Sequence, residues 1–406
     1  MNNQHHFRVR RALEDYEVIV VGAGPYGLTI AERVANELHK NVCVLERREH
    51  LGGNCYTEPD CESGIECHKY GAHIFHTKIE EVWEYLNRFT TFTNYRHRVL
   101  TVHKGQVYSM PINLGTICSF FGRCMSPGAA KKLIDSQAAV AGRSVPSNLE
   151  EKAISLIGRP LYEAFVRGYT KKQWGVDPRE LPADVIVRLP VRFNFEPFYF
   201  SDPHEGIPVN GYTSMFQRMA DSPRIDLRLG VDFLEVRRQL HPDQLVIYSG
   251  PIDRYFDYRL GALGWRTLDF EKEVVAVNDF QGAAVVNYAD EEVPYTRIHE
   301  FKHFHGERNY AAGKTVIYRE YSRSATRADE PYYPLNLSQD KKRFAAYAEL
   351  AARETHVIFG GRLGGYQYLD MDKTVDSALR TFREQVVPFF GAKILPVPAR
   401  RIAEAA

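Results

Sequence analysis

The chain has 406 residues, 44% of them hydrophobic, and this length predicts two or three structural units with a substantial core. Its 52 basic and 51 acidic residues nearly cancel, so the net charge of +1 gives no electrostatic case for binding nucleic acid. No apolar run approaches the roughly 18 residues needed to span a bilayer, and residues 1–15 read as a polar tail without the apolar core of a signal peptide.

The first predicted elements, within residues 16–54, follow the order of a dinucleotide-binding unit. Residues 18–21 form a short β-branched run typical of a buried strand, and the pattern Gly22, Gly24 and Gly27 follows directly. An amphipathic helical stretch comes next, and then a second strand that ends at Glu46. The glycines let backbone approach a pyrophosphate, and the acid can bind the hydroxyl pair of a ribose. This order predicts a dinucleotide site.

The stretch after Glu46 narrows the dinucleotide to FAD. Basic residues and a glycine pair stand directly behind the acid, in the order Arg47, Arg48, Glu49, His50, Leu51, Gly52, Gly53 and Asn54. This extension resembles flavoproteins of the amine-oxidase type, and simple NAD dehydrogenases lack it. The resemblance implies that the glycines let backbone pass close to the phosphates of the cofactor.

The six cysteines fit a reduced, cytoplasmic protein. Three of them, Cys55, Cys61 and Cys67, lie near histidines, which invites a metal interpretation. None of the C-x-x-C spacings of structural zinc sites occurs. The sequence therefore predicts no metal site.

The remainder of the chain changes character several times. A turn at 71–77 carries His73 and His76, residues 98–108 predict a hairpin, and residues 112–180 predict short helices. After a strand-rich, aromatic region, a buried strand at 356–359 leads through a glycine-rich loop into a helix from about Met371. The N-terminus of that helix is expected to face the flavin ring and to favour the negative charge of a reduced flavin.

These elements predict a mixed α/β (α+β) protein with three parts. They are a Rossmann-like FAD-binding domain from 16–95, 211–250 and 341–406; a mainly helical substrate lobe at 96–184 with a mobile loop at 168–177; and an antiparallel sheet domain from 185–210 and 251–340.

Motifs along nearly the whole chain resemble bacterial UDP-galactopyranose mutases. They are VGAGPYG, ERREHLGGN, YGAHIFHT, YTKKQWG at 169–175, VNYAD…VPYTRIHEFKHF at 286–304, DEPYYP at 329–334 and GGRLGGYQYLDMD. The resemblance implies FAD that is active when reduced, with UDP-galactopyranose and UDP-galactofuranose as substrates. In this family the flavin N5 attacks the anomeric carbon, UDP leaves, and a flavin iminium lets the sugar ring open and reclose. We also expect a homodimer.

The resemblance assigns the site residues as well. The expected catalytic residues are Arg188, Arg297 and His76, and the two arginines are expected to bind the diphosphate. The expected cofactor contacts are Gly22, Gly24, Gly27, Glu46, Arg47, Gly53, Asn54, His73, Ile74, Arg362, Tyr368, Leu369, Asp370 and Met371. The expected substrate contacts are Asn94, Phe165, Tyr169, Thr170, Trp174, Arg188, Tyr199, Asn287, Arg297, Tyr333 and Tyr368. The uracil is expected near Phe165 and Tyr169, and Trp174 on a lid whose end glycines act as hinges and whose lysines are drawn to the diphosphate.

Two other functions stay open. An amine- or porphyrinogen-oxidase-like flavoenzyme shares the dinucleotide fingerprint but needs neither the paired arginines nor the YTKKQW motif. A non-catalytic nucleotide-binding flavoprotein keeps the fingerprint but needs no histidines facing the flavin. UDP binding that tightens only after flavin reduction distinguishes a mutase from both.

Overall fold

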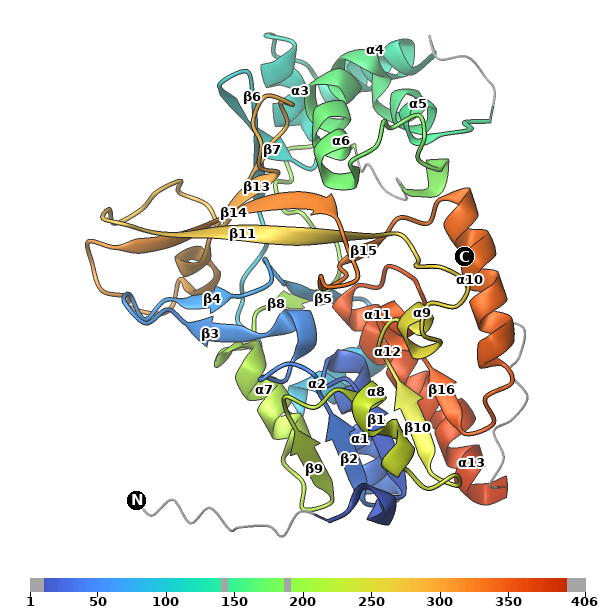
Figure 1. Ribbon diagram of the computed structural model, residues 1–406. Helices are drawn as coiled ribbons and strands as arrows, with labels where there is room; N and C mark the ends of the chain where they lie inside the picture. The colour runs from blue at the N-terminus through green and yellow to red at the C-terminus, as the bar shows by residue number, and fades with distance from the viewer. Residues whose placement is uncertain (1–10, 140–144, 186–190, 393–406) are drawn as a thin grey trace.

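The structure is a computed structural model that describes residues 11–139, 145–185 and 191–392. The chain is arranged in three tiers in the view of Figure 1. A parallel sheet with its helices lies at the bottom, a long twisted sheet crosses the middle, and a helical lobe lies at the top. The mixed α/β fold class predicted from the sequence is confirmed.

The lower tier is built on a five-stranded parallel sheet. Its strands, in spatial order, are β16 (Val357–Phe359), β10 (Leu245–Tyr248), β1 (Val18–Val21), β2 (Val42–Leu45) and β9 (Ile225–Arg228). β1, β2 and β10 are buried along their whole length, because helices and loops cover both faces of the sheet. Three separate segments of the chain supply these strands, which are distant in sequence but adjacent in the sheet.

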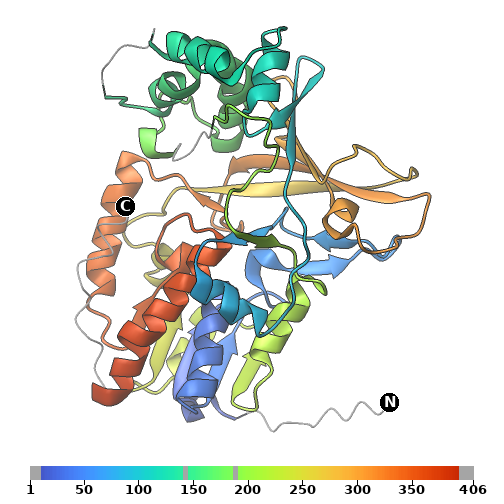
Figure 2. The same cartoon turned by 180° about the vertical axis from the view of Figure 1, so that it is seen from behind.

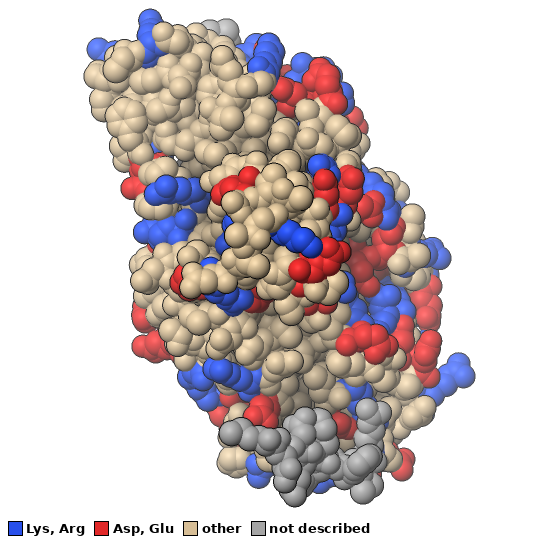
Figure 3. Space-filling model, turned by 90° about the vertical axis from the view of Figure 1, so that its left-hand side faces the viewer, with Lys and Arg blue, Asp and Glu red and all other residues tan. Residues whose placement is uncertain are grey.

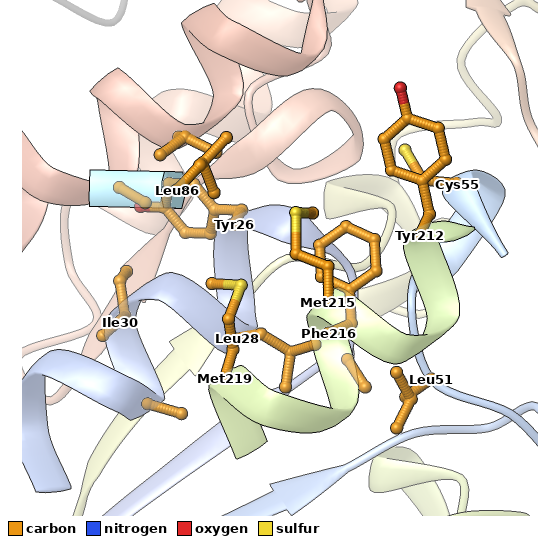
Figure 4. Close-up of a cluster of buried hydrophobic side chains, with 14 of the residues drawn as sticks. Tyr26, Leu28, Ile30, Leu51, Cys55, Leu86, Tyr212, Met215, Phe216 and Met219 are labelled. Carbon is orange, nitrogen blue, oxygen red and sulfur yellow. The ribbon is translucent and has the colours of Figure 1, made fainter. Parts of the chain in front are cut away.

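Apolar helix faces form the main core against this sheet. The covering helices include α1 (Pro25–Glu37), α7 (Gly211–Ala220) and α12 (Met371–Thr381). Figure 4 shows Leu28 of α1 close to Met215 and Met219 of α7. The short helices α8 (Phe233–Val236) and α9 (Ile252–Tyr255) follow β9 and β10.

The middle tier is a seven-stranded sheet. Its spatial order is β15 (Tyr333–Pro334), β11 (Trp265–Val275), β14 (Thr315–Ser324), β13 (Arg297–Glu300), β12 (Val285–Tyr288), β6 (Val99–His103) and β7 (Gln106–Met110). All neighbours are antiparallel except β12 and β6, which run parallel. The predicted hairpin at 98–108 is confirmed as β6 and β7, but its strands extend this sheet and do not belong to the helical lobe, where the sequence placed them.

The upper tier is the helical lobe. It contains α3 (Leu114–Phe120), α4 (Pro127–Ala139), α5 (Leu149–Tyr162), a π-helix at Glu163–Arg167 and α6 (Gly168–Trp174). Their apolar faces form a separate core. A kink at Gly158, with φ of 76°, divides α5. The lobe is joined to the middle sheet by α6, which packs against β14.

Short elements complete the fold. They are the antiparallel pairs β3 (Thr57–Pro59) with β4 (Glu66–His68) and β5 (Phe75–Thr77) with β8 (His204–Gly206), and the helices α2 (Glu80–Asn87), α10 (Ser338–Ala351), α11 (Gly361–Gly364) and α13 (Val387–Ala392). The segment 185–210 was predicted to belong to the antiparallel sheet domain; in its described part, 191–210, the strand β8 pairs with β5, and Phe198 forms an isolated bridge with Arg98, just before β6. Seen from behind in Figure 2, α12 and α13 run along the parallel sheet.

The surface mixes charges of both signs. On the face shown in Figure 3, lysines and arginines alternate with acidic residues, without a broad patch of one sign. Among the residues that the structure describes, none of the helices combines the length and the apolar composition that crossing a bilayer requires.

Candidate active site

The turn between β1 and α1 brings backbone to the carboxyl end of the parallel sheet. Gly22 has a φ of 101°, and a Cβ there would lie 2.3 Å from Ser249 Oγ. A Cβ on Gly27 would lie 2.0 Å from the carbonyl oxygen of Gly22. α1 begins at Pro25 with Gly24 as its N-cap residue, so the first N–H groups of α1 face the turn. This geometry suits a pyrophosphate at the helix N-terminus.

Glu46, at the end of β2, holds this turn in place. One carboxylate oxygen accepts a hydrogen bond from the Ala23 N–H at 2.8 Å, and the other accepts from the Arg48 N–H at 2.9 Å. Glu46 is buried and lines the same cavity as the glycines. Because each carboxylate oxygen has two lone pairs, these bonds orient the acid and leave acceptors for a ribose.

Charged side chains hold the loop after Glu46 over the turn. Arg47 and Arg48 both pair with Glu330, at 2.5 Å and 2.7 Å. Arg48 also donates to Asn54 Oδ1 at 2.9 Å. Its Nη1 is buried and has no hydrogen-bond partner in the part of the chain that the structure describes. A buried guanidinium donor of this kind fits an anionic ligand.

One cavity extends from this turn to the N-terminus of α12. Gly53 and Gly24 meet closely at its wall, where a Cβ on Gly53 would lie 3.2 Å from Gly24 Cα. The lining includes Gly22, Gly24, Glu46, Arg47, Gly53, Asn54, His73, Arg362, Met371 and Thr374. Segments predicted to bind the two ends of a dinucleotide therefore share a single cavity.

Five of the predicted cofactor contacts lie outside this lining: Gly27, Ile74, Tyr368, Leu369 and Asp370. Ile74 packs against the main core. The Leu369 carbonyl accepts a hydrogen bond from Arg362 at 2.7 Å, and Tyr368 lies with its ring 5.0 Å below the Arg362 guanidinium. Asp370 is the N-cap residue of α12. Tyr368, Leu369 and Asp370 therefore adjoin the cavity lining through Arg362 and α12.

The two histidines of the 71–77 motif have different surroundings. His73 lines the cavity, and its Nδ1 donates to the Gly71 carbonyl at 2.8 Å. Burial lowers the pKa of His73 to about 4, so its ring is neutral at physiological pH. His76 lies on β5, outside the lining, where its ring stacks on Phe200 at 3.7 Å and its Nδ1 lies 2.6 Å from Asp202 Oδ2.

A second group of polar side chains surrounds Arg297 on β13. Arg297 Nε lies 3.2 Å from Glu320 Oε1, and Arg297 Nη2 donates to the Tyr169 hydroxyl. Glu320 also accepts from Thr296 Oγ1 at 2.8 Å and from His299 Nε2 at 3.1 Å. Burial alone raises the pKa of Glu320, but the charge of Arg297 and these hydrogen bonds lower it to about 2. The guanidinium is thus held in one orientation.

Aromatic side chains connect this group with the cavity. The Tyr333 ring lies 5.7 Å from Tyr368 and 6.4 Å from Trp174. Arg362 lies over Tyr368 and itself lines the cavity. Tyr199, 44% exposed, packs edge-on against His97 at 5.8 Å. Cations and exposed hydroxyls are therefore concentrated beside the α12 end of the cavity.

The predicted loop at 168–177 is a helix over its first seven residues, so this prediction was wrong for 168–174. Hydrogen bonding continues from the π-helix into α6, which ends at Gly175 with a φ of 69°. Gly168 serves close packing, because a Cβ there would lie 2.4 Å from the Ala289 carbonyl oxygen. Lys171 pairs with Glu291 at 2.8 Å.

The Lys172 side chain is also bound by other groups of the protein. Its Nζ lies 2.7–3.0 Å from four backbone carbonyl oxygens of the β12–β13 connection, those of Tyr288, Asp290, Val293 and Tyr295, which share its three N–H donors. Four carbonyl oxygens around one ammonium group replace its hydration. The two lysines therefore fasten α6 to this connection, and the structure does not direct them at a diphosphate.

The other predicted substrate contacts differ in their surroundings. Asn287 lies directly opposite Arg297 in the sheet, and its Oδ1 is buried without a hydrogen-bond partner among the described residues. Phe165 packs in the core of the helical lobe, and Thr170 is buried. Asn94 is exposed. Of this set, the structure brings Asn287 closest to the Arg297 group.

Sequence reasoning missed Glu320, the ion-pair partner of Arg297. The alternation of residues 315–324 predicts a strand, which places Glu320 on one face but does not say which cation it meets. The register of β13 and β14 decides this, since it sets Arg297 directly opposite Glu320. Arg188, the other predicted diphosphate arginine, lies outside the described residues.

Acid is expected to remove the stabilisation that Glu320 provides. Its pKa of about 2 in the folded protein lies below the value of about 4.3 for an unfolded chain, so the contribution is present above pH 4.3 and is lost as pH falls toward 2. Two pKa units correspond to about 3 kcal/mol. Glu320→Gln is therefore expected to lower the free energy of unfolding by about 3 kcal/mol at pH 7, and the difference from wild type should shrink below pH 4.

Urea unfolding at pH 3 to 7 measures this difference. The control is Glu271→Gln on the neighbouring strand β11, whose side chain is 57% exposed, lies 3.6 Å from Arg319 and accepts a solvent-exposed hydrogen bond from the Tyr321 hydroxyl, which Gln can also accept. A difference between wild type and Glu320→Gln that stays constant across this pH range would contradict the assignment of a buried carboxylate.

The fold and the site together define an FAD-binding flavoprotein. The residues present fit the cofactor, since a glycine turn, the buried acid Glu46, a buried arginine donor without a partner among the described residues and a helix N-terminus all meet one cavity. A family model for NAD(P)-binding Rossmann-like domains matches residues 20–89, and a family model for UDP-galactopyranose mutase matches residues 164–368.

The chain belongs to the UDP-galactopyranose mutase family and is therefore an isomerase that uses FAD. It is 43% identical to dTDP-fucopyranose mutase of Escherichia coli, over 89% of this chain and 96% of that protein. It is 42% identical to the probable UDP-galactopyranose mutase of Klebsiella pneumoniae, over 95% and 98%. A crystal structure of reduced UDP-galactopyranose mutase shares the fold, with a TM-score of 0.71, 15% identity, and coverage of 92% of this chain and 94% of that one.

Proposed function

We propose that this protein interconverts UDP-galactopyranose and UDP-galactofuranose. The observation that carries the proposal is the contact of Arg362 with both regions of the site. It lines the FAD cavity, and it lies over Tyr368, which adjoins Tyr333 and the surroundings of Arg297. A sugar diphosphate bound at the tyrosines and arginines therefore presents its sugar to the α12 end of the cavity.

The residues of this chain have separable roles in such a reaction. Reduced FAD, when bound, supplies the nucleophile for the anomeric carbon. Arg297, kept charged and oriented by Glu320, stabilises the negative charge that develops on the departing diphosphate, and Arg188 is proposed as its partner. Tyr199 and Tyr333 donate hydroxyl hydrogen bonds to the phosphates.

Other residues shape the site around the sugar and the flavin. Trp174, at the end of α6 beside Tyr333, covers the sugar nucleotide and excludes water. The proposed flavin contacts include the neutral His73 in the cavity, with His76 as the second histidine of the motif. Asn287 offers its buried amide oxygen to a substrate hydroxyl. A cytoplasmic location and a homodimer also remain proposals, the first supported by the cysteine pattern of the sequence.

A second substrate pair is favoured by the comparison with the E. coli relative. Relatives described as acting on dTDP-fucopyranose and on UDP-galactopyranose are 43% and 42% identical to this chain. Both substrates carry a diphosphate and a six-membered sugar ring. The Arg297 group is proposed to bind the diphosphate, which both substrates share, so it does not distinguish them. The nearly equal sequence identities to the two relatives do not distinguish them either.

The test incubates dithionite-reduced, FAD-loaded protein with each pyranose substrate and separates the products by chromatography. We expect furanose product from UDP-galactose, with a higher kcat/KM than for dTDP-fucose. A higher kcat/KM for dTDP-fucose would show that dTDP-fucopyranose, and not UDP-galactopyranose, is the preferred substrate. No furanose product from either, or oxygen consumption with an amine, would refute the mutase assignment.

A further inference from the structure

The register of the seven-stranded sheet places a row of polar side chains on one face, beneath α6. Directly opposite residues in antiparallel strands share a face, as do residues two apart on one strand. Ser324, Ser322 and Glu320 of β14 therefore share a face with Arg266 of β11, with Tyr333 of β15 and with Arg297 of β13. The hydrogen bonds of Arg266 agree with this placement on one face, since Arg266 donates to Ser324 Oγ at 3.0 Å and to Ser322 Oγ at 3.2 Å.

Arg266 is buried, and its side-chain hydrogen bonds to other described residues all go to neutral groups. It is 3% exposed, and besides the two serines it donates from Nε to the Gln173 carbonyl at 3.0 Å and from Nη2 to the Lys172 carbonyl at 3.3 Å. These carbonyls lie in the last turn of α6, where the helix dipole is negative. Arg266 thus caps the C-terminal end of α6.

Among the residues that the structure describes, the charge of Arg266 has no counter-ion. No carboxylate lies within ion-pair distance of it in the part of the chain that the structure describes, although Arg297 on the same face pairs with Glu320. Burial lowers the pKa of Arg266, and no neighbouring charge opposes that effect. A buried cation normally has an anionic partner, because taking an isolated charge out of water costs several kcal/mol.

The two arginines bracket α6. Arg297 contacts Tyr169 near its first turn, and Arg266 holds the carbonyls of its last. The fit at Arg266 is tight, since a Cβ on Gly175 would lie 2.4 Å from Arg266 Nη1. Trp174 follows Gln173 directly and adjoins Tyr333, the cross-strand neighbour of Arg266. The uncompensated charge therefore lies beneath the aromatic wall of the proposed substrate site.

We propose that Arg266 is a positioning residue for the sugar nucleotide, which fixes the end of α6 and supplies a positive charge that the substrate diphosphate balances. The inference rests on the proposed function, because it requires a nucleoside diphosphate at the Arg297 group. Its charge acts through a water-poor interior, where electrostatic attraction is stronger than in water. The serines and carbonyls keep the guanidinium in place when the anion is absent.

The experiment compares the binding of UDP with that of uridine, which lacks phosphates. In Arg266→Met, the Kd for UDP is expected to rise about tenfold while the Kd for uridine changes less than about twofold. Arg266→Lys keeps the charge and loses most of the capping hydrogen bonds, and it is expected to restore most of the UDP affinity. UDP is titrated by calorimetry and uridine by ligand-observed NMR, with FAD-loaded protein throughout.

Arg323→Met provides a matched control. Arg323 neighbours Ser324 on β14 but faces the other side, where it is 44% exposed and pairs with Asp269 and Asp329. It is expected to leave the Kd for both ligands unchanged. FAD content and melting temperature verify folding, and if Arg266→Met does not fold, Arg266→Gln takes its place.

The outcomes separate the inference from the function on which it rests. Equal weakening of UDP and uridine binding, or failure of Arg266→Lys to restore UDP affinity, would show that Arg266 only caps α6. Unchanged UDP binding in Arg266→Met would overturn the inference and leave the proposed function intact. Wild-type protein that binds no UDP would overturn both.

Discussion

Arg297→Ala is expected to lower kcat/KM for UDP-galactopyranose by about 100-fold or more while FAD stays bound. The residue lies outside the cavity lining, so its loss spares the cofactor. Losing a charge-assisted donor to a diphosphate removes about 3 kcal/mol of transition-state stabilisation, which corresponds to this factor. Steady-state kinetics with dithionite-reduced protein and the ratio of flavin to protein absorbance measure the two quantities.

Loss of Arg297 also leaves Glu320 buried without its ion pair. Breaking a buried pair costs about 3–5 kcal/mol, so part of the lost activity could reflect unfolding. The double variant Arg297→Ala with Glu320→Gln removes the stranded charge and is expected to melt above Arg297→Ala but to remain as inactive. If the double variant recovers near-normal turnover, Arg297 does not act on the substrate.

Reduction of the flavin is expected to raise the mutase activity from the background rate to its full value. The proposed chemistry needs an electron pair on the cofactor, which oxidised flavin lacks, and the sugar returns it in each turnover. Met371 and Thr374 in the first turn of α12 line the cavity, and the positive end of the helix dipole there favours an anion, such as a reduced flavin would be. The acid in that turn, Asp372, faces away and accepts a hydrogen bond from Thr77.

The measurement follows furanose formation anaerobically, before and after addition of dithionite, and then after admission of air. Activity should appear with reduction, disappear with reoxidation, and consume no reductant in proportion to product. Full activity of the oxidised protein in air would contradict the mechanism. Stoichiometric consumption of a reductant would instead indicate an oxidoreductase, the first of the alternative functions.

The FAD-binding half was largely predictable because its signals are local. The strand, the glycine turn, the helix and Glu46 follow one another within about thirty residues, and backbone sterics require glycine at Gly22 and Gly27. Nine of the predicted cofactor contacts line the cavity, including Arg362 and Met371 from the far end of the chain. The helix at Met371 was also predictable, from its apolar period.

The seven-stranded sheet and the helical lobe were predicted less well, because local sequence does not determine which strands pair by hydrogen bonds. The hairpin at 98–108 was recognised, but its edge meets β12, nearly two hundred residues later in the chain. The glycines at 168 and 175 read as hinges, although one serves close packing and the other ends a helix. A glycine in a sequence is equally consistent with a flexible backbone and with a site too crowded for a Cβ. Only the residues that surround it in the fold distinguish the two.

The sequence by itself determined the cofactor class, the family and the residue types of the site. Tertiary structure alone decided which charges are balanced. Glu320 neutralises Arg297 because β13 and β14 align in one particular register, whereas Arg266 meets the carbonyls of α6 and, in the described ranges, no carboxylate. The energy of a charge depends on its distance to other charges and to water, and folding sets these distances between segments far apart in the chain.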